Sequence, residues 1–193
     1  SPNAYLVLKV LPQIADAHGA EIKLLPCLLG GIFKATGNQA PLFAFAGIKG
    51  KLEYERLEMQ RFIELHKLQA FRMNPHFPIN TLGLMRGMVA AQHMGVANEY
   101  LDIVLGGMWE AGEKMDDPAV FLACLNKGGL DGQRLIELAN SPDVKAELVA
   151  NTDAAAARGV FGIPTFFVGD EMFFGKERIG QIEDLLKRMA ASA

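Results

Sequence analysis

Cysteine is scarce in this chain of 193 residues, which holds only Cys27 and Cys124. No C-x-x-C pair occurs, and this argues against a disulfide oxidoreductase. The two cysteines lie far apart, among leucine, alanine and proline residues. We therefore expect two unpaired core thiols rather than a disulfide or a metal pair, because buried cysteine behaves as a small hydrophobic residue. Unpaired thiols are typical of a reducing compartment, so we expect a cytoplasmic location.

Other missing features exclude further classes of protein. No apolar run approaches the ~18 residues that a membrane span needs. The formal net charge is −3, and Lys and Arg form no block. We therefore expect neither a membrane nor nucleic acid as a partner. The histidines have no metal-ligand spacing, so we expect no metal site. They are His18, His66, His76 and His93.

The pattern of apolar residues predicts a mixed fold with a helical interior. Half of the residues are hydrophobic, enough for the core of one domain with an insertion. The large aromatic residues Phe33, Phe43, Phe45 and Trp109 are interpreted as core. The expected elements are a helix over 1–18, a strand over 21–25, helices throughout 50–158, strands over 165–168 and 172–174, and a helix over 179–191.

Two motifs at opposite ends of the chain resemble a thioredoxin-type thiol site. Ser1-Pro2-Asn3-Ala4 opens the first helix, and Ile163-Pro164-Thr165 opens a strand after an apolar run. Redox members of this class open the helix with C-x-x-C. Here Ser1 and Ala4 stand at the two cysteine positions. The sequence therefore predicts a site that keeps the architecture without the redox chemistry.

Ser1 has two interpretations. It is a preferred N-cap residue, and Pro2 suits the first helical position. Its hydroxyl could also stabilise a thiolate that a ligand supplies. Lowering a thiol pKa from about 8.5 to about 6.5 needs roughly 2.7 kcal/mol. A helix N-terminus supplies about 0.3–2 kcal/mol and one hydrogen bond to a charged group about 1.5–3 kcal/mol, so no metal or base is needed.

The Ile163-Pro164 bond is expected to be cis, although X-Pro bonds are trans by default. A cis bond would offer the backbone of Ile163 to a peptide-like ligand as an added strand. Farther along, Glu177 follows the last strand in Gly175-Lys176-Glu177-Arg178. It either complements a helix dipole or binds the amino group of an amino-acid-like ligand, and the residues alone leave both open.

An ordered set of motifs resembles the kappa-class glutathione transferases and the 2-hydroxychromene-2-carboxylate isomerases, which are related to the DsbA oxidoreductases. The set covers nearly the whole chain. Its parts are Ser1-Pro2 with Tyr5-Leu6, the Leu28–Asn38 segment, the Asn80–Arg86 segment, Val160–Thr165 and Phe173–Arg178.

This resemblance implies an α/β thioredoxin-like fold with an inserted all-helical domain. Residues 1–29 and 159–193 would form the thioredoxin-like domain, and residues 30–158 the insertion. A thioredoxin sheet has a strand directly before the site helix, so we expect the native chain to begin several residues upstream of Ser1. The resemblance also implies a homodimer.

The resemblance implies glutathione as cofactor and assigns roles to individual residues. Ser1 would stabilise the glutathione thiolate, and Ile163, before Pro164, would bind the cysteinyl backbone. Asn38, with Lys49 or Lys51, would contact the ligand backbone or the glycyl carboxylate. Glu177 would take the γ-glutamyl amino group. Lys176 would also belong to the γ-glutamyl site, where it departs from the Ser, Asn or Gln common in the family.

Three functions remain open at this point. The first is a glutathione-dependent isomerase of a small aromatic substrate, in which the thiolate adds reversibly to a conjugated double bond. The second is a kappa-class transferase that conjugates electrophiles; the Gly30–Asn38 segment leans towards this branch. The third is a non-catalytic glutathione or peptide binder. We expect an enzyme, with the isomerase favoured.

Overall fold

The structure, a computed structural model, describes residues 1–191. The chain divides into two compact units. The first unit consists of Ser1–Leu24, Thr36–Gln69 and Val160–Ala193. The second consists of Leu25–Ala35 and Ala70–Gly159. Residues 36–69 thus belong to the first unit and residues 25–35 to the second.

The first helix is shorter than expected. Instead of one helix over residues 1–18, the structure has α1 (Pro2–Leu8) and α2 (Leu11–Ala17) with a turn between them. Pro12 explains the break. It has no N–H to donate to the carbonyl of Leu8, and its ring would clash with that carbonyl in a continuous helix. In the shorter α2, Pro12 lies in the first turn, where no such bond is required.

The expected strand over residues 21–25 is not present, and residues 20–28 have no regular secondary structure. Alternating apolar residues make a strand only where a neighbouring strand completes the hydrogen-bond ladder. Within residues 1–191, the sheet consists of two antiparallel strands, β1 (Thr165–Val168) and β2 (Glu171–Phe174). This C-terminal hairpin confirms the prediction. Its turn places Gly169 at φ 59°, a conformation that suits glycine in a two-residue loop.

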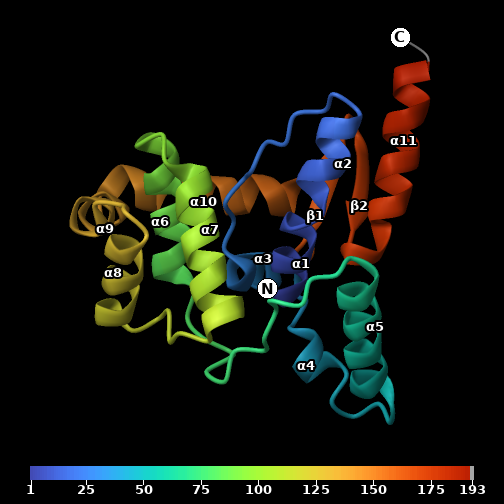
Figure 1. The fold of residues 1–193 in the computed structure, drawn as a ribbon, viewed down its shortest axis with the longest axis horizontal. Helices are drawn as coiled ribbons and strands as arrows, with labels where there is room; N and C mark the ends of the chain where they lie inside the picture. The colour runs from blue at the N-terminus through green and yellow to red at the C-terminus, as the bar shows by residue number, and fades with distance from the viewer. Residues whose placement is uncertain (192–193) are drawn as a thin grey trace. The chain divides into compact units, whose positions relative to one another are not determined.

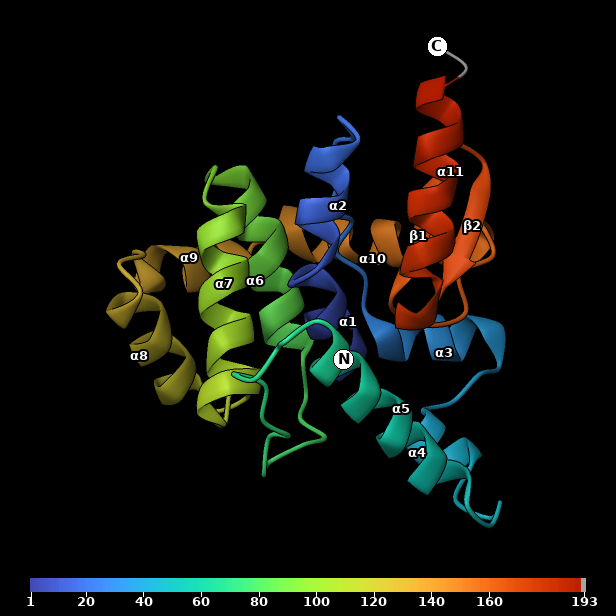
Figure 2. The same cartoon turned by 45° about the vertical axis from the view of Figure 1, so that its right-hand side comes forward.

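Four further helices of the first unit lie within residues 1–191, and the predicted helical ranges cover two of them, 51–65 and 179–191. They are α4 (Pro41–Ala44), α5 (Lys51–Leu65), the short 3₁₀ helix η2 (Lys176–Arg178) and α11 (Ile179–Ala191). α11 has the predicted bounds and buries Ile179, Ile182 and Leu185. It lies along the hairpin in both ribbon views (Figures 1 and 2). It also packs against α2, where His18 Nε2 lies 3.5 Å from Glu183 Oε1.

The second unit is built from helices, which the periodicity predicts over 50–158 but not over 29–36. They are α3 (Leu29–Thr36), α6 (Leu82–His93), α7 (Ala97–Gly106), the π-helical turn η1 (Gly107–Ala111), α8 (Pro118–Lys127), α9 (Gly132–Ala139) and α10 (Pro142–Ala157). α6 is central and contacts α7, α9 and α10. Gly87 allows α7 to approach, because an added Cβ would lie 2.3 Å from the Tyr100 hydroxyl oxygen. That hydroxyl donates to the Leu84 carbonyl at 2.6 Å, which satisfies a buried polar group.

The aromatic and cysteine predictions have mixed outcomes. Trp109 is buried as expected, whereas Phe43 is 66% exposed, so its interpretation as core was wrong. Phe43 lies on α4, a single turn with no buried residue, which leaves its ring nothing to pack into. Cys27 is buried, Cys124 is half-buried, and both are unpaired, as predicted.

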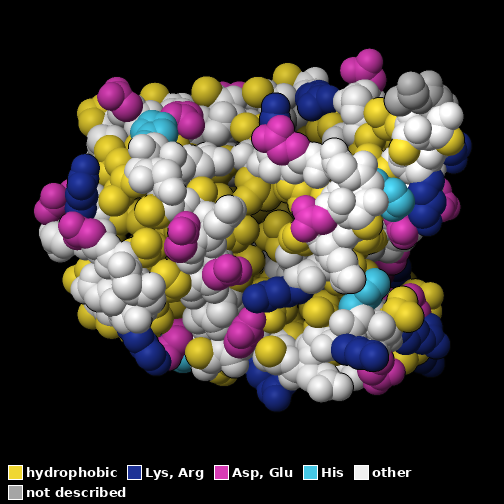
Figure 3. Space-filling model, turned by 45° about the horizontal axis from the view of Figure 1, so that its top comes forward, with side chains coloured by type: hydrophobic (Ala, Val, Ile, Leu, Met, Phe, Trp, Pro, Cys, Tyr) yellow, Lys and Arg dark blue, Asp and Glu magenta, His cyan; other side chains and the backbone are white. Residues whose placement is uncertain are grey.

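The surface mixes charges of both signs. Acidic and basic side chains are interspersed on the face drawn in Figure 3, in keeping with the small net charge. In the part of the chain that the structure describes, no helix is both long and apolar enough to cross a membrane.

Candidate active site

Ser1 joins the start of α1 to the loop before β1. Its Oγ accepts a hydrogen bond from the Ala4 N–H at 3.3 Å, which confirms the predicted N-cap. The same hydroxyl donates to the Ile163 carbonyl oxygen at 3.4 Å. This second bond is long and therefore weak. The hydroxyl proton can consequently turn towards a stronger acceptor without a large cost in free energy.

The loop that carries Ile163 is held from both sides. The Ile163-Pro164 bond is cis, as predicted, and Pro164 is buried. The Gly175 N–H donates to the Pro164 carbonyl at 3.0 Å, and the Thr165 hydroxyl donates to the Gly162 carbonyl at 2.6 Å. The Ile163 N–H has no hydrogen-bond partner within residues 1–191. The loop is thus fixed while one backbone donor stays available to a ligand.

Asn38 is brought to the same loop. Its Nδ2 donates to the Phe161 carbonyl at 2.7 Å, and its Oδ1 accepts from the Gln39 N–H at 2.8 Å. Because both ends of the side-chain amide are engaged, Asn38 positions the segment that leads to Ile163. Phe161 is fixed further by its ring contact with Phe174, with centroids 4.6 Å apart.

Lys176 and Glu177 lie on η2, which contacts α1. The Lys176 side chain is only 2% exposed, and its ammonium pairs with the Glu177 carboxylate. The ammonium also lies 5.8 Å from the centroid of the Phe62 ring, within reach of a cation–π interaction. Glu177 keeps 46% of its side chain exposed. The half-exposed Glu177 carboxylate, paired with the buried Lys176 ammonium, therefore lies on η2, which packs against α1.

The positive charge of Lys176 also acts on Glu58 of α5. A hydrogen bond from Arg61 is the main cause that lowers the pKa of the Glu58 carboxyl, and the charge of Lys176 contributes to the same shift. Burial of Lys176 was not anticipated from the sequence, where lysine after a strand is typical of a surface.

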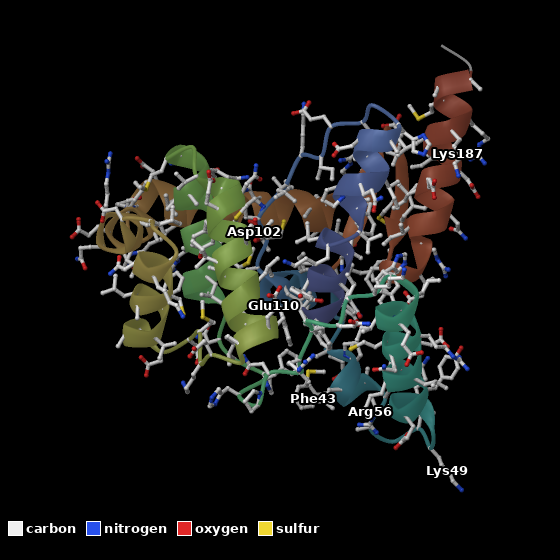
Figure 4. The ribbon with its side chains drawn as sticks, viewed as in Figure 1. Phe43, Lys49, Arg56, Asp102, Glu110 and Lys187 are labelled. Carbon is white, nitrogen blue, oxygen red and sulfur yellow. The ribbon has the colours of Figure 1, made fainter. Side chains whose placement is uncertain are left out.

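Within residues 1–191, Lys49 and Lys51 have no ion pair or hydrogen bond with Ser1, Ile163 or Glu177. Lys51 Nζ pairs with Glu55 Oε1 at 2.6 Å and lies 5.0 Å from the centroid of the Phe45 ring. Lys49 lies on the loop before α5 and points away from the ribbon (Figure 4).

Asn3 is a polar residue of the site helix to which the sequence analysis assigned no role. Its Oδ1 is buried and has no hydrogen-bond partner among the described residues. An unsatisfied buried acceptor costs about 1–3 kcal/mol. Its signal in the sequence was its position, since Asn3 is the second of the three residues between Ser1 and Tyr5, which stand where a redox site has x-x-C.

The capped start of α1 lies against the cis-proline loop, which is the arrangement of a thioredoxin-type site. In this chain Ser1 and Ala4 stand where a redox site has its two cysteines. Residues 1–187 match the family model described as the DSBA-like thioredoxin domain. The chain therefore belongs to the family of DsbA-like thioredoxin domains.

Individual relatives are similar over almost the whole chain. The 2-hydroxychromene-2-carboxylate isomerase of Pseudomonas putida is 28% identical over 190 residues, covering 98% of this chain and 91% of the relative. Human glutathione S-transferase kappa 1 is 27% identical over 206 residues, covering 96% and 86%. A solved structure of a 2-hydroxychromene-2-carboxylate isomerase superposes with a TM-score of 0.84 at 26% identity, covering all of this chain and 92% of that one.

Proposed function

We propose that this protein is a glutathione-dependent isomerase of the 2-hydroxychromene-2-carboxylate type. The observation that carries the proposal is the Ser1 hydroxyl, which lies at the start of α1 and contacts the Ile163 carbonyl where a redox relative would have a cysteine. The similarity to isomerases over nearly full length supports the choice of reaction.

The residues of the site fit a γ-glutamyl tripeptide. The unpartnered Ile163 N–H and the neighbouring carbonyl suit the cysteinyl backbone, as in an added β-strand. The half-exposed Glu177 carboxylate suits an ammonium group. Bound glutathione would supply a thiolate that adds reversibly to the conjugated double bond of the substrate and then leaves, without any net redox change.

The role of the protein in this mechanism would be to stabilise the thiolate form of the glutathione sulfur. Ser1 would turn its proton from the Ile163 carbonyl to the sulfur, and the Asn3 N–H with the positive end of the α1 dipole would favour the negative charge. Together these effects supply the roughly 2.7 kcal/mol that a two-unit decrease in the thiol pKa needs. Asn38 would keep the Ile163 loop in register through the Phe161 carbonyl.

Glutathione transfer is the second candidate. The similarity to human glutathione S-transferase kappa 1 favours it, because a stabilised thiolate can also attack an electrophile irreversibly. In either case we propose a small aromatic substrate, a homodimer and a cytoplasmic location. The third candidate, a non-catalytic binder, has the same ligand and no turnover.

One experiment separates these functions. The purified protein is given 2-hydroxychromene-2-carboxylate or 1-chloro-2,4-dinitrobenzene, each with glutathione, with S-methylglutathione, or with neither. An isomerase reaches the equilibrium of the chromene and its ring-opened isomer only with glutathione and leaves the glutathione concentration unchanged. A transferase consumes glutathione with the chlorinated substrate. Turnover of the chromene with S-methylglutathione would contradict the proposal, because that analogue has no thiolate.

A further inference from the structure

A cavity of about 400 Å³ lies within the second unit, lined by residues of α3, α6 and α10. Its size falls in the range of roughly 300–1,000 Å³ that small-molecule sites occupy. All of its lining residues belong to the second unit, and none of them is assigned above to glutathione.

Three cationic side chains line this cavity. They are Lys34 of α3, Arg86 of α6 and Lys145 of α10. Arg86 and Lys145 are half-buried, and none of the three has an ion-pair or hydrogen-bond partner among residues 1–191. A cation that is partly removed from water without a counter-charge is unfavourable, so an anion between these helices would be stabilised. The acidic residue that faces them is Asp153, which is exposed.

The rest of the lining is largely apolar. Leu148 and Val149 of α10 line the cavity together with Leu82, which lies one turn before Arg86 on α6. Val149 is 59% exposed, so its methyl groups are accessible from solvent. An inorganic ion would leave these carbon atoms in water, whereas a ligand with an apolar body would cover them.

The wall between α3 and α10 is closely packed. An added Cβ on Gly31 would lie 2.8 Å from Thr152 Cγ2. The Thr152 hydroxyl accepts from the Leu28 N–H at 3.0 Å and donates to the Leu148 carbonyl at 2.7 Å. These contacts tie α3 to α10, so the cavity is bounded by fixed helices on this side.

We propose that this cavity binds a small organic carboxylate with an aromatic or aliphatic body. Arg86 and Lys145 hold the carboxylate, Lys34 adds a third positive charge, and Leu82, Leu148 and Val149 cover the apolar part. A planar guanidinium matches a carboxylate with two parallel hydrogen bonds. The negative charge of Asp153 repels a dianion more than a monoanion. The cavity should therefore bind a singly charged carboxylate more tightly than inorganic phosphate, which is partly a dianion near neutral pH.

The test uses 2-naphthoate as the probe and 2-naphthamide as its neutral analogue. Binding is followed in the full chain by the methyl resonances of Leu82, Leu148 and Val149. The expected result is saturable shifts of these resonances with 2-naphthoate, at least tenfold weaker binding of 2-naphthamide, and weaker binding of inorganic phosphate than of 2-naphthoate. Equal affinity for the acid and the amide, tighter binding of phosphate, or shifts confined to other methyl groups would each overturn the proposal.

Variants identify the residues. Arg86→Met and Lys145→Met remove the charge but keep an unbranched side chain, and each should weaken 2-naphthoate binding about tenfold or more. Arg134→Met, which removes an exposed charge on α9, should leave binding unchanged. Because Val149 is exposed, its substitution does not endanger folding. Val149→Asp should weaken binding more than Val149→Asn, since only the aspartate repels the anion. Equal affinities for these two variants would contradict an anion at this place.

Discussion

The Ser1 hydroxyl oxygen lies 3.4 Å from the carbonyl oxygen of Ile163, although 162 positions separate the two residues in the chain. The same oxygen caps α1 through the Ala4 N–H. One side chain therefore contacts both the start of α1 and the cis-proline loop. Substitutions can test the effect of Ser1 on folding stability separately from its proposed effect on the glutathione thiolate.

Ser1→Ala should impair the glutathione thiolate more than it impairs folding. Loss of one charge-assisted hydrogen bond should raise the pKa of the bound thiol by roughly one to two units, since such a bond contributes about 1.5–3 kcal/mol. Loss of the cap should lower the free energy of unfolding by about 1 kcal/mol. Ultraviolet absorbance of the thiolate and urea unfolding measure the two effects.

Ser141→Ala is the matched control for that substitution. Ser141 also precedes a proline and caps α10 through the Val144 N–H at 3.3 Å. It should lose similar stability without any change in the pKa of bound glutathione. If the Ser1 variant titrated like the parent protein, the serine would be a cap alone and the proposed role of its hydroxyl would be refuted.

Asn38→Asp should weaken glutathione binding by about three- to tenfold. The aspartate can still accept from the Gln39 N–H, but it cannot donate to the Phe161 carbonyl, so the segment before Ile163 loses one tether. Calorimetric titration gives the affinity. Asn140→Asp, which removes an amide donor to the Ile136 carbonyl at the end of α9, should leave the affinity unchanged. Equal effects of both variants would argue against a positioning role for Asn38.

Asn3→Ala should stabilise the protein by about 1 kcal/mol. The substitution removes a buried acceptor without a partner and adds a residue of higher helix propensity. Urea unfolding of the parent and the variant measures the difference. A destabilised variant would show that Asn3 makes favourable interactions that outweigh its unsatisfied oxygen.

Stability in acid should depend on Glu183. Its pKa is lowered chiefly by the hydrogen bond from Lys187 and then by the one from His18. A folded-state pKa below the ordinary value of 4.5 means that the ionised carboxylate stabilises the fold above about pH 4.5. This contribution is lost as the pH falls through the folded-state pKa. Glu183→Gln should therefore lower the stability at neutral pH and flatten its decline in acid.

Unfolding curves at several pH values measure the effect of Glu183. Asp16→Asn on α2 is the control, because Asp16 is an exposed carboxylate of the same unit. A parent-like acid profile for Glu183→Gln, or an identical change for Asp16→Asn, would contradict the assignment.

Local sequence patterns were sufficient to predict several elements of the fold. The hairpin over 165–174 and the helix over 179–191 were predicted from strand alternation, a Gly-Asp turn and an amphipathic stripe, all of which act over a few neighbouring residues. The Ser1 cap was predicted for the same reason. The strand over 21–25 failed because a strand depends on a partner that its own residues do not specify. The break near Lys9 could have been predicted from Pro12.

The candidate site was only partly accessible from the sequence. Ser1, Ile163 and Asn38 were named, and the structure joins them through the contacts of the serine with Ile163 and of the asparagine with Phe161. The burial of Lys176 was not predicted, because a lysine has the same sequence signature on the surface and in the interior.

The sequence by itself determined the elements that depend on near neighbours, including the capped start of α1, the C-terminal hairpin and the absence of a cysteine pair. Only the tertiary structure decided which charges are buried and which helices face one another. Lys34, Arg86 and Lys145 are more than fifty residues apart at each step, and they line one cavity because α3, α6 and α10 pack around it. The physical reason is that packing and desolvation depend on the whole chain, whereas caps and turns depend on a few residues.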